Sequence, residues 1–237
     1  MIALPLLVER RQLVTPGDLL AEGDFQPGDN TYKSNGKIIS QRLGLAEFKG
    51  KRVSVVALKG PYVPRVGDLV IGRIIDIVLG GWLVDINSPY TANLSVSDVT
   101  GKPFSPEMVS LSRILAIGDI VVAKVAAFDR TRDPAITIRE RGLGRVEGGV
   151  IIDLTPTKVP RLIGRKGSMI NMIKQLTKCE IIAGQNGKVL IKGRNLKMVE
   201  LAIHSVRMIE EQAHTSGLTD RIRRFIEEEK EKASRMI

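Results

Sequence analysis

The sequence predicts a multidomain chain that combines an all-β part with an α+β part. Turn residues alternate with short β-type runs as far as about residue 145, a βααββα pattern follows, and one more amphipathic helix comes last. We therefore expect a small β-rich N-terminal domain at 1–64, a five-stranded barrel at 65–145, an α+β domain at 146–214 and a C-terminal helical tail at 215–237.

The first 64 residues read as a small domain of hairpins. Short β-type runs lie at 37–40 and 53–58, and they are separated by turn signals such as the Asn35-Gly36 pair. The phrase GPYVP at 60–64 then stiffens the backbone, because each proline restricts its own φ and the residue before it. We place the first domain boundary there.

An internal repeat marks the second domain. The segment GDLVIGRI at 67–74 is similar to GDIVVAKV at 118–125, and each is a turn that leads into a strand rich in β-branched residues. Further strand runs lie at 82–86, 93–96 and 135–138. Five short strands with an insert before the fourth are typical of an OB-type barrel.

This second segment resembles an S1 RNA-binding domain. The matching phrases are VGD at 66–68, GGWLVD at 80–85, LSVS at 94–97 and FDR at 128–130 with ITI at 136–138. The resemblance implies that Trp82 is an aromatic on which a base stacks; the alternative is a tryptophan of the core or of an interface. Leu79 and Ser95 depart from the family pattern, which often has an aromatic and a histidine there.

Cations of the barrel are candidates for lining an RNA-binding face. They are Arg73, Lys124, Arg130 and Arg132, and the alternative for each is a solvated strand edge. The glycine-rich stretch at 141–149 is expected to be a linker.

The phrase LIGRKGS at 162–168 is the strongest functional signal. Gly164 and Gly167 flank Arg165 and Lys166 between two apolar runs, so a turn without side chains at its corners carries two positive charges at its tip. Such a turn can lie against a phosphate backbone. The order Lys-Gly-Ser at 166–168 excludes a nucleotide-binding P-loop, which needs Gly-Lys-Ser/Thr.

The flanks of this turn resemble a KH domain of the eukaryotic type. A strand run at 150–154 and a helix broken by Pro156 and Pro160 precede it, and a helix with apolar residues at 169, 170, 173 and 176 follows. Two β-type runs divided by the GQNG turn at 184–187 then lead to a helix capped by Asn195. The resemblance makes residues 164–167 the G-x-x-G clamp that grips about four nucleotides of a single strand.

Charge agrees with a polyanionic partner. The net charge is +10 with a pI of about 9.9, and residues 158–197 hold ten Lys and Arg against the single acid Glu180. His204 and His214 lack the companions of a metal site, and no nucleophile or phosphate-loop motif is present. We expect no enzyme activity, no metal and no cofactor.

Cysteine content and the N-terminus bear on the compartment. Cys179 has no partner for an internal disulfide and lies in an apolar strand run, so we expect a buried thiol and a reducing cytoplasm. The apolar run at 2–8 is too short to span a bilayer and is split by Pro5, so we expect neither a signal peptide nor a membrane partner.

The domain order resembles the S1/KH-type RNA-binding cap subunit of the archaeal exosome. The phrases PGD at 16–18, NTY at 30–32 and YVPRVGDLVIG at 62–72 carry this resemblance. It implies a non-catalytic subunit, in three copies with or without a related cap protein, on a hexameric ring of RNase PH-like subunits. The N-terminal domain would hold the ring, while the S1 and KH domains capture single-stranded RNA and feed its 3′ end inward.

Two other functions remain open at this point. One is a free S1/KH adaptor in translation or transcription. The other is a hydrolase whose residues come together only in the folded chain.

Overall fold

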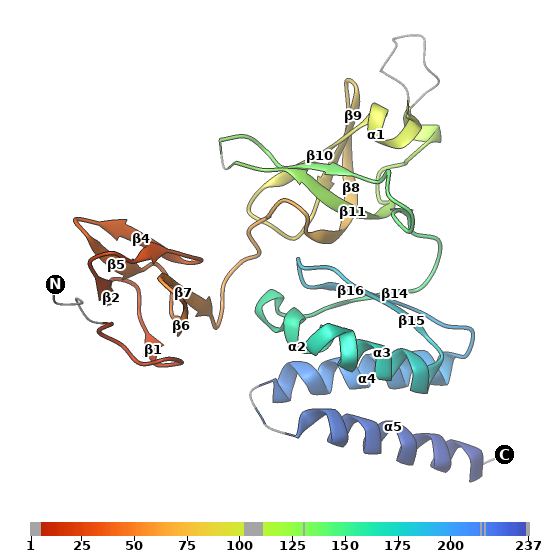
Figure 1. Cartoon of the computed structure of the whole chain (residues 1–237). Coiled ribbons are helices and arrows are strands. Elements are labelled where there is room, and N and C mark those ends of the chain that lie inside the picture. Colours follow the sequence, from red (N-terminus) through yellow and green to blue (C-terminus); the bar gives the residue numbers. More distant parts are fainter. Residues whose placement is uncertain (1–5, 102–110, 130, 214, 216, 236–237) are drawn as a thin grey trace. The chain divides into compact units, whose positions relative to one another are not determined.

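The computed structural model of the chain describes residues 6–101, 111–129, 131–213, 215 and 217–235. It divides into two compact units, Met1–Gly60 and Pro61–Ile237 (Figure 1). Each unit has its own buried hydrophobic residues. No helix in these described ranges has the length and apolar character that crossing a membrane requires.

The N-terminal unit contains two small sheets. In one, β5 lies between β2 and β4, and in the other the strand order is β1-β6-β7-β3. The strands are β1 (Leu13–Val14), β2 (Leu19–Glu22), β3 (Gln26–Pro27), β4 (Thr31–Ser34), β5 (Lys37–Ser40), β6 (Gly44–Lys49) and β7 (Arg52–Ala57).

The predicted hairpin turn of this unit is confirmed. Asn35 and Gly36 both have positive φ, 48° and 77°, which a two-residue type I′ connection requires. The turn sets the register of β4 and β5, and this register buries Ile38 completely in the core of the unit.

The second unit begins with the predicted five-stranded barrel. It closes because β12 pairs with β10 on one side and with β11 on the other. Its elements are β8 (Leu69–Val78), β9 (Gly81–Asp85), β10 (Thr91–Ser95), α1 (Val96–Thr100), a 3-10 turn η1 (Leu111–Arg113), β11 (Ile120–Ala127) and β12 (Ala135–Thr137).

The segments that precede and follow the barrel strands in the sequence both pack or pair with the barrel. Tyr62, in the proline-rich segment, is 6% exposed and donates a hydrogen bond of 2.7 Å from its hydroxyl to Asp68 Oδ2. On the other side, β13 (Gly144–Arg145) pairs with β11, so the stretch expected to be a linker adds a strand to the sheet.

The α+β part follows with the predicted βααββα order. Its sheet has the order β14-β16-β15, and all its pairings are antiparallel. The elements are β14 (Val150–Asp153), η2 (Pro156–Lys158), α2 (Val159–Ile163), η3 (Arg165–Gly167), α3 (Ser168–Thr177), β15 (Glu180–Ala183), β16 (Lys188–Lys192), α4 (Leu196–Gln212) and α5 (Leu218–Arg235).

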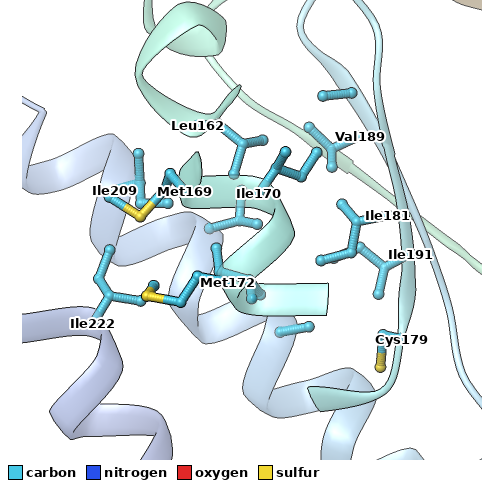
Figure 2. Packing of buried hydrophobic residues seen from close by; sticks show 14 of the residues in the cluster. Leu162, Met169, Ile170, Met172, Cys179, Ile181, Val189, Ile191, Ile209 and Ile222 are labelled. Carbon is cyan, nitrogen blue, oxygen red and sulfur yellow. The ribbon is translucent and has the colours of Figure 1, made fainter. Parts of the chain in front are cut away.

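The helices pack on one face of this sheet. Figure 2 shows this core, in which Leu162 and Ile170 lie toward Ile181 of β15 and Val189 and Ile191 of β16. Met169 lies in the same cluster, next to Ile209 of α4. The C-terminal helix α5 joins this core through Leu218 and Ile222, which are 1% and 0% exposed. The tail is therefore an integral layer of the α+β part.

The opposite face of the same sheet packs against the barrel. Side chains alternate along β16, so Val189 and Ile191 face the helices, whereas Leu190 faces the other way and meets Ile71 and Val122 of the barrel. The two parts are thus joined by a buried apolar contact.

Asn186, in the β15–β16 turn, completes this contact and is 0% exposed. Its Oδ1 accepts from the Ile71 N–H at 3.3 Å, and its Nδ2 donates to the Ile71 and Ile86 carbonyls at 2.7 and 2.9 Å. Asn87 Nδ2 donates back to the Asn186 carbonyl at 2.8 Å. One amide side chain therefore satisfies three buried backbone groups of the barrel.

Candidate nucleic-acid interface

The turn between α2 and α3 has a conformation that requires its glycines. Gly164 has φ 74° and ψ 176°, a region that is essentially restricted to glycine, and an added Cβ would lie 2.8 Å from the Met169 backbone nitrogen. Gly167 has φ 79°. Between them Lys166 adopts φ 52°, which is uncommon for a residue with a Cβ. The chain thus accepts local strain at the tip of this turn.

Apolar anchors hold the turn from both sides. Leu162, before it, is fully buried, and Met169, after it, is 3% exposed (Figure 2). Arg165 and Lys166 are exposed between these anchors. We call residues 164–167 the clamp. Its geometry is a glycine-cornered turn, anchored on both sides, that carries two exposed cations.

The clamp cations differ from their neighbours in having no partner. In the described part of the chain, no hydrogen bond or ion pair holds the side chain of Arg165 or Lys166. By contrast, Lys158 Nζ donates to the Glu210 carbonyl and Arg161 Nη2 to the Thr215 carbonyl, each at 2.7 Å. The two clamp side chains therefore remain available to an external anion.

The expectation that Trp82 stacks on a base is wrong. Trp82 is 0% exposed, belongs to the barrel core and donates a hydrogen bond of 2.9 Å from Nε1 to the Leu115 carbonyl. The indole ring is fully buried and its N–H is already hydrogen-bonded, so a base cannot stack on it. The alternative interpretation, a core tryptophan, is confirmed.

Arg73 and Lys124 lie on the barrel face that packs against the α+β part. Strand pairing places Arg73 opposite Ile120 and Lys124 opposite Leu69, at the two ends of that contact. Arg73 is exposed, whereas Lys124 Nζ donates to both carboxylate oxygens of Glu140 at 2.8 and 3.1 Å. Arg130 lies outside the described residues.

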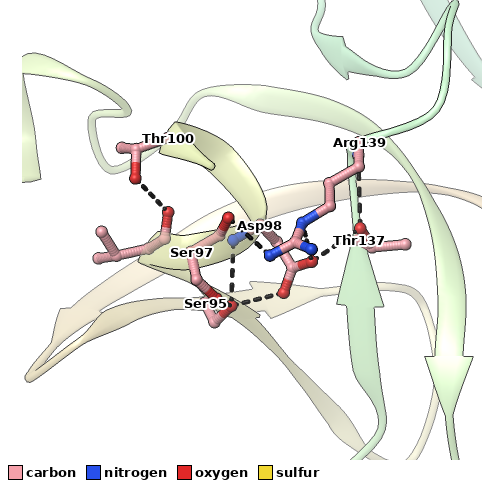
Figure 3. Close-up of polar contacts among 7 residues, drawn as sticks. Ser95, Ser97, Asp98, Thr100, Thr137 and Arg139 are labelled. Carbon is pink, nitrogen blue, oxygen red and sulfur yellow. Dashed lines mark hydrogen bonds and ion pairs between the residues drawn. The ribbon is translucent and has the colours of Figure 1, made fainter. Parts of the chain in front are cut away.

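Ser95 stands where the S1 pattern often has histidine, and it serves the fold. Its hydroxyl caps α1 by accepting from the Asp98 N–H at 3.2 Å, and it donates to Asp98 Oδ2 at 2.5 Å (Figure 3). Asp98 Oδ1 also accepts from Thr137 Oγ1 at 2.9 Å and pairs with Arg139 Nε at 3.1 Å. This network ties α1 to the end of β12 and leaves Ser95 occupied.

Two partly exposed aromatic residues of the barrel were given no role from the sequence, although Phe128 belongs to the FDR phrase at 128–130. Tyr90 and Phe128 lie with ring centroids 4.9 Å apart and ring planes at 68°. They are 38 residues apart in the sequence, so only the closure of the barrel brings them together. The available signal was that each residue borders a loop of an OB-type barrel.

A metal site has no support among the described residues. They contain no group of three or more His, Cys, Asp or Glu that could hold a metal ion. Burial, followed by the hydrogen bond to Asp68, raises the pKa of Tyr62 far above its usual value. Tyr62 belongs to the barrel core, so its shifted pKa reflects packing.

A closed OB-type barrel joined to a βααββα unit with an exposed G-x-x-G clamp defines an S1/KH-type RNA-binding protein. Family models agree along the chain. The model for the exosome RNA-binding protein Rrp4 N-terminal domain matches residues 11–59, that for the Rrp4 S1 domain residues 61–127, and that for the KH domain residues 150–208.

Relatives extend over nearly the whole chain. The exosome complex component Rrp4 of Thermofilum pendens is 44% identical over 229 residues, which cover 95% of this chain and 97% of that protein. The component of the same name from Ignisphaera aggregans is 42% identical, with 97% and 95% covered. A crystal structure of a protein assigned as an exosome complex RNA-binding protein is 45% identical, with a TM-score of 0.69 over 73% of this chain and 99% of that one. The chain belongs to the Rrp4 family of exosome components.

Proposed function

We propose that the chain is a non-catalytic cap subunit that captures single-stranded RNA and delivers its 3′ end to an RNase PH-like hexameric ring. The observation that carries the RNA-binding part is the clamp, because it presents two unpartnered cations on a glycine-cornered turn next to a helix N-terminus. Membership of the exosome Rrp4 family supports the ring as partner.

The proposed capture of RNA depends on contacts to phosphates and on the connection of several binding modules. Each phosphate contact to a single strand contributes a slope of about −0.7 to log K against log salt, so five contacts weaken binding roughly 100-fold between 50 and 200 mM salt. Joining the barrel to the clamp, and placing three copies around one pore, raises avidity when one strand reaches more than one module. Modest affinity at each module then suffices.

An exposed apolar face on the N-terminal unit supports docking to a protein partner. Register places Leu13, Leu45 and Val56 side by side across β1, β6 and β7, pointing away from the buried Val14 and Val55. We call the whole set the apolar face; it consists of the exposed residues Leu13 (57%), Leu43 (43%), Val56 (49%) and Leu58 (43%) and the partly exposed Leu45. Contiguous exposed apolar side chains of this kind mark interaction sites.

Two sets of substitutions test the two halves of the proposal separately. Arg165→Glu with Lys166→Glu should weaken binding of a single-stranded oligonucleotide at least tenfold and leave ring association intact, because only phosphate contacts are lost. Leu13→Asp with Val56→Asp should abolish co-elution with the ring and leave oligonucleotide binding intact. Fluorescence anisotropy measures the first effect, and gel filtration with the ring subunits measures the second.

Matched controls separate specific from general effects. Arg223→Glu with Arg224→Glu makes the same change of charge on exposed residues of α5, and Leu196→Asp makes the same apolar-to-acid change on a leucine that is 79% exposed. Equal loss of RNA binding in the clamp variant and the α5 variant would contradict the clamp. Ring association that survives Leu13→Asp with Val56→Asp would contradict docking through the apolar face, and a chain that never associates with the ring would favour a free adaptor.

A further inference from the structure

The burial of Trp82 leaves the barrel without a stacking surface at the position that sequence reasoning assigned. Of the aromatic residues described in the barrel, Tyr62 and Trp82 are buried, whereas Tyr90 and Phe128 are partly exposed and pack edge to face. Base stacking on aromatic side chains, together with a positively charged groove, is the sequence-tolerant way in which OB-type barrels bind single strands.

The position of the pair fits that role. Tyr90 ends the connection from β9 to β10, which are the second and third strands of the barrel. Phe128 begins the connection from β11 to β12, the fourth and fifth strands. The face formed by strands two and three and the loop between strands four and five are where this fold class binds oligonucleotides.

The Tyr90 hydroxyl and the side chain of Arg132 are available for contact with a ligand. In the part of the chain that the structure describes, the Tyr90 hydroxyl makes no hydrogen bond. Arg132, in the β11–β12 connection, has an exposed side chain. The nearby Asp129 carboxylate accepts from the Thr131 hydroxyl at 2.8 Å and from the Thr131 N–H at 2.9 Å, and these bonds hold its pKa below its usual value. Asp129 therefore shapes the loop through Thr131.

The loop that carries Tyr90 is also hydrogen-bonded to the α+β part. Asn87 donates to the Asn186 carbonyl in the β15–β16 turn. Tyr90 is three residues from Asn87, so its backbone lies within about 11 Å of that residue. The same β15–β16 turn is bonded to the segment before the clamp, because the Leu154 N–H donates to the Gly187 carbonyl at 2.7 Å. The helical residues 156–163 connect this segment to the clamp and span at most about 16 Å. A single strand in the clamp therefore has Tyr90 within reach.

We propose that Tyr90 and Phe128 form a base-stacking site for the same RNA strand that the clamp holds by its phosphates. This inference rests on the proposed RNA-binding function and adds a second, uncharged contact to it. The clamp supplies salt-dependent affinity, and the aromatic pair supplies affinity that salt screens little.

Substitutions at Tyr90 in the full chain test the proposal with a 12-nucleotide oligouridylate. Tyr90→Leu keeps an apolar side chain but removes the π-face, and it should weaken binding by roughly 5- to 100-fold. Tyr90→Trp and Tyr90→Phe keep a π-face and should bind within about threefold of the original chain. The slope of log K against log salt should be the same for all three, because no phosphate contact changes.

A second measurement remains informative if Tyr90→Leu destabilises the barrel. The indole introduced by Tyr90→Trp should lose fluorescence when the oligonucleotide binds, while Trp82 is shielded by its burial. Phe128 packs against the barrel core, so it is left unchanged.

The outcomes separate this inference from the function on which it rests. Unchanged affinity in Tyr90→Leu, or no quenching in Tyr90→Trp, overturns the stacking site. If the Tyr90 tests fail but Arg165→Glu with Lys166→Glu still weakens RNA binding, the proposed RNA capture holds without the stacking site. If the original chain does not bind the oligonucleotide, alone or on its ring, both proposals fall.

Discussion

Two turns in the α+β part share the spacing Gly-x-x-Gly but differ in whether their central residues are exposed or buried. The clamp at 164–167 exposes its two central residues, Arg165 and Lys166. The turn at 184–187 buries Asn186 completely against the barrel. Spacing alone therefore does not say which turn exposes its central side chains.

The central side chains explain the difference. A guanidinium or ammonium group loses several kcal/mol when it leaves water unpaired, so a turn with two cations at its tip stays outside. An amide carries both a donor and an acceptor, and Asn186 uses them on Ile71 and Ile86. The same backbone spacing thus gives an exposed turn with two cations in one place and a buried junction between the barrel and the α+β part in the other.

The largest effect is expected from breaking the buried turn. Asn186→Leu leaves three backbone groups of the barrel without partners, and each costs about 1–3 kcal/mol. We expect the free energy of unfolding of this unit to fall by about 3–5 kcal/mol, measured by urea denaturation. Asn171→Leu, at an exposed position of α3, is the control and should change it by less than about 0.5 kcal/mol. Similar losses in both variants would show that Asn186 does not hold the junction.

An intermediate effect is expected from the backbone of the clamp. Gly164→Ala forces a Cβ into a conformation that is essentially restricted to glycine, against the Met169 nitrogen, and should cost about 1–3 kcal/mol. RNA affinity should fall as well, because the cations move with the turn. Gly36→Ala is the comparison, since Gly36 has φ 77° with open space around it. Normal RNA affinity in Gly164→Ala would mean that binding does not depend on the shape of the turn.

Much of the fold follows from local pattern. The run expected at 37–40 is β5, and Asn195 caps α4 by accepting from the Lys197 and Met198 N–H groups at 2.9 and 3.4 Å. These features depend on side-chain alternation and on capping chemistry within a few residues. The clamp was also visible, because its glycines and its charges are adjacent in the sequence.

The errors concern contacts between distant segments. Trp82 lies inside because residue 82 alternates with Val84 toward the core and because Leu115, 33 residues away, supplies its acceptor. The alternation is visible in the sequence, whereas the S1 pattern has an exposed aromatic at this position. The stretch at 141–149 contains β13 because an edge of the barrel is free to pair with it. Asn186 gains its role from a domain contact that no local pattern encodes.

The smallest effect should separate charge from backbone strain at the tip of the clamp. Lys166→Asn removes one cation but suits a positive φ, so the free energy of unfolding should change by less than about 0.5 kcal/mol. The slope of log K against log salt for RNA should become less steep by about 0.7, the value of one phosphate contact to a single strand. Lys166→Arg keeps the charge and should keep the slope. If Lys166→Asn leaves the slope unchanged, Lys166 does not contact phosphate, and the difference between the two turns would depend on Arg165 alone.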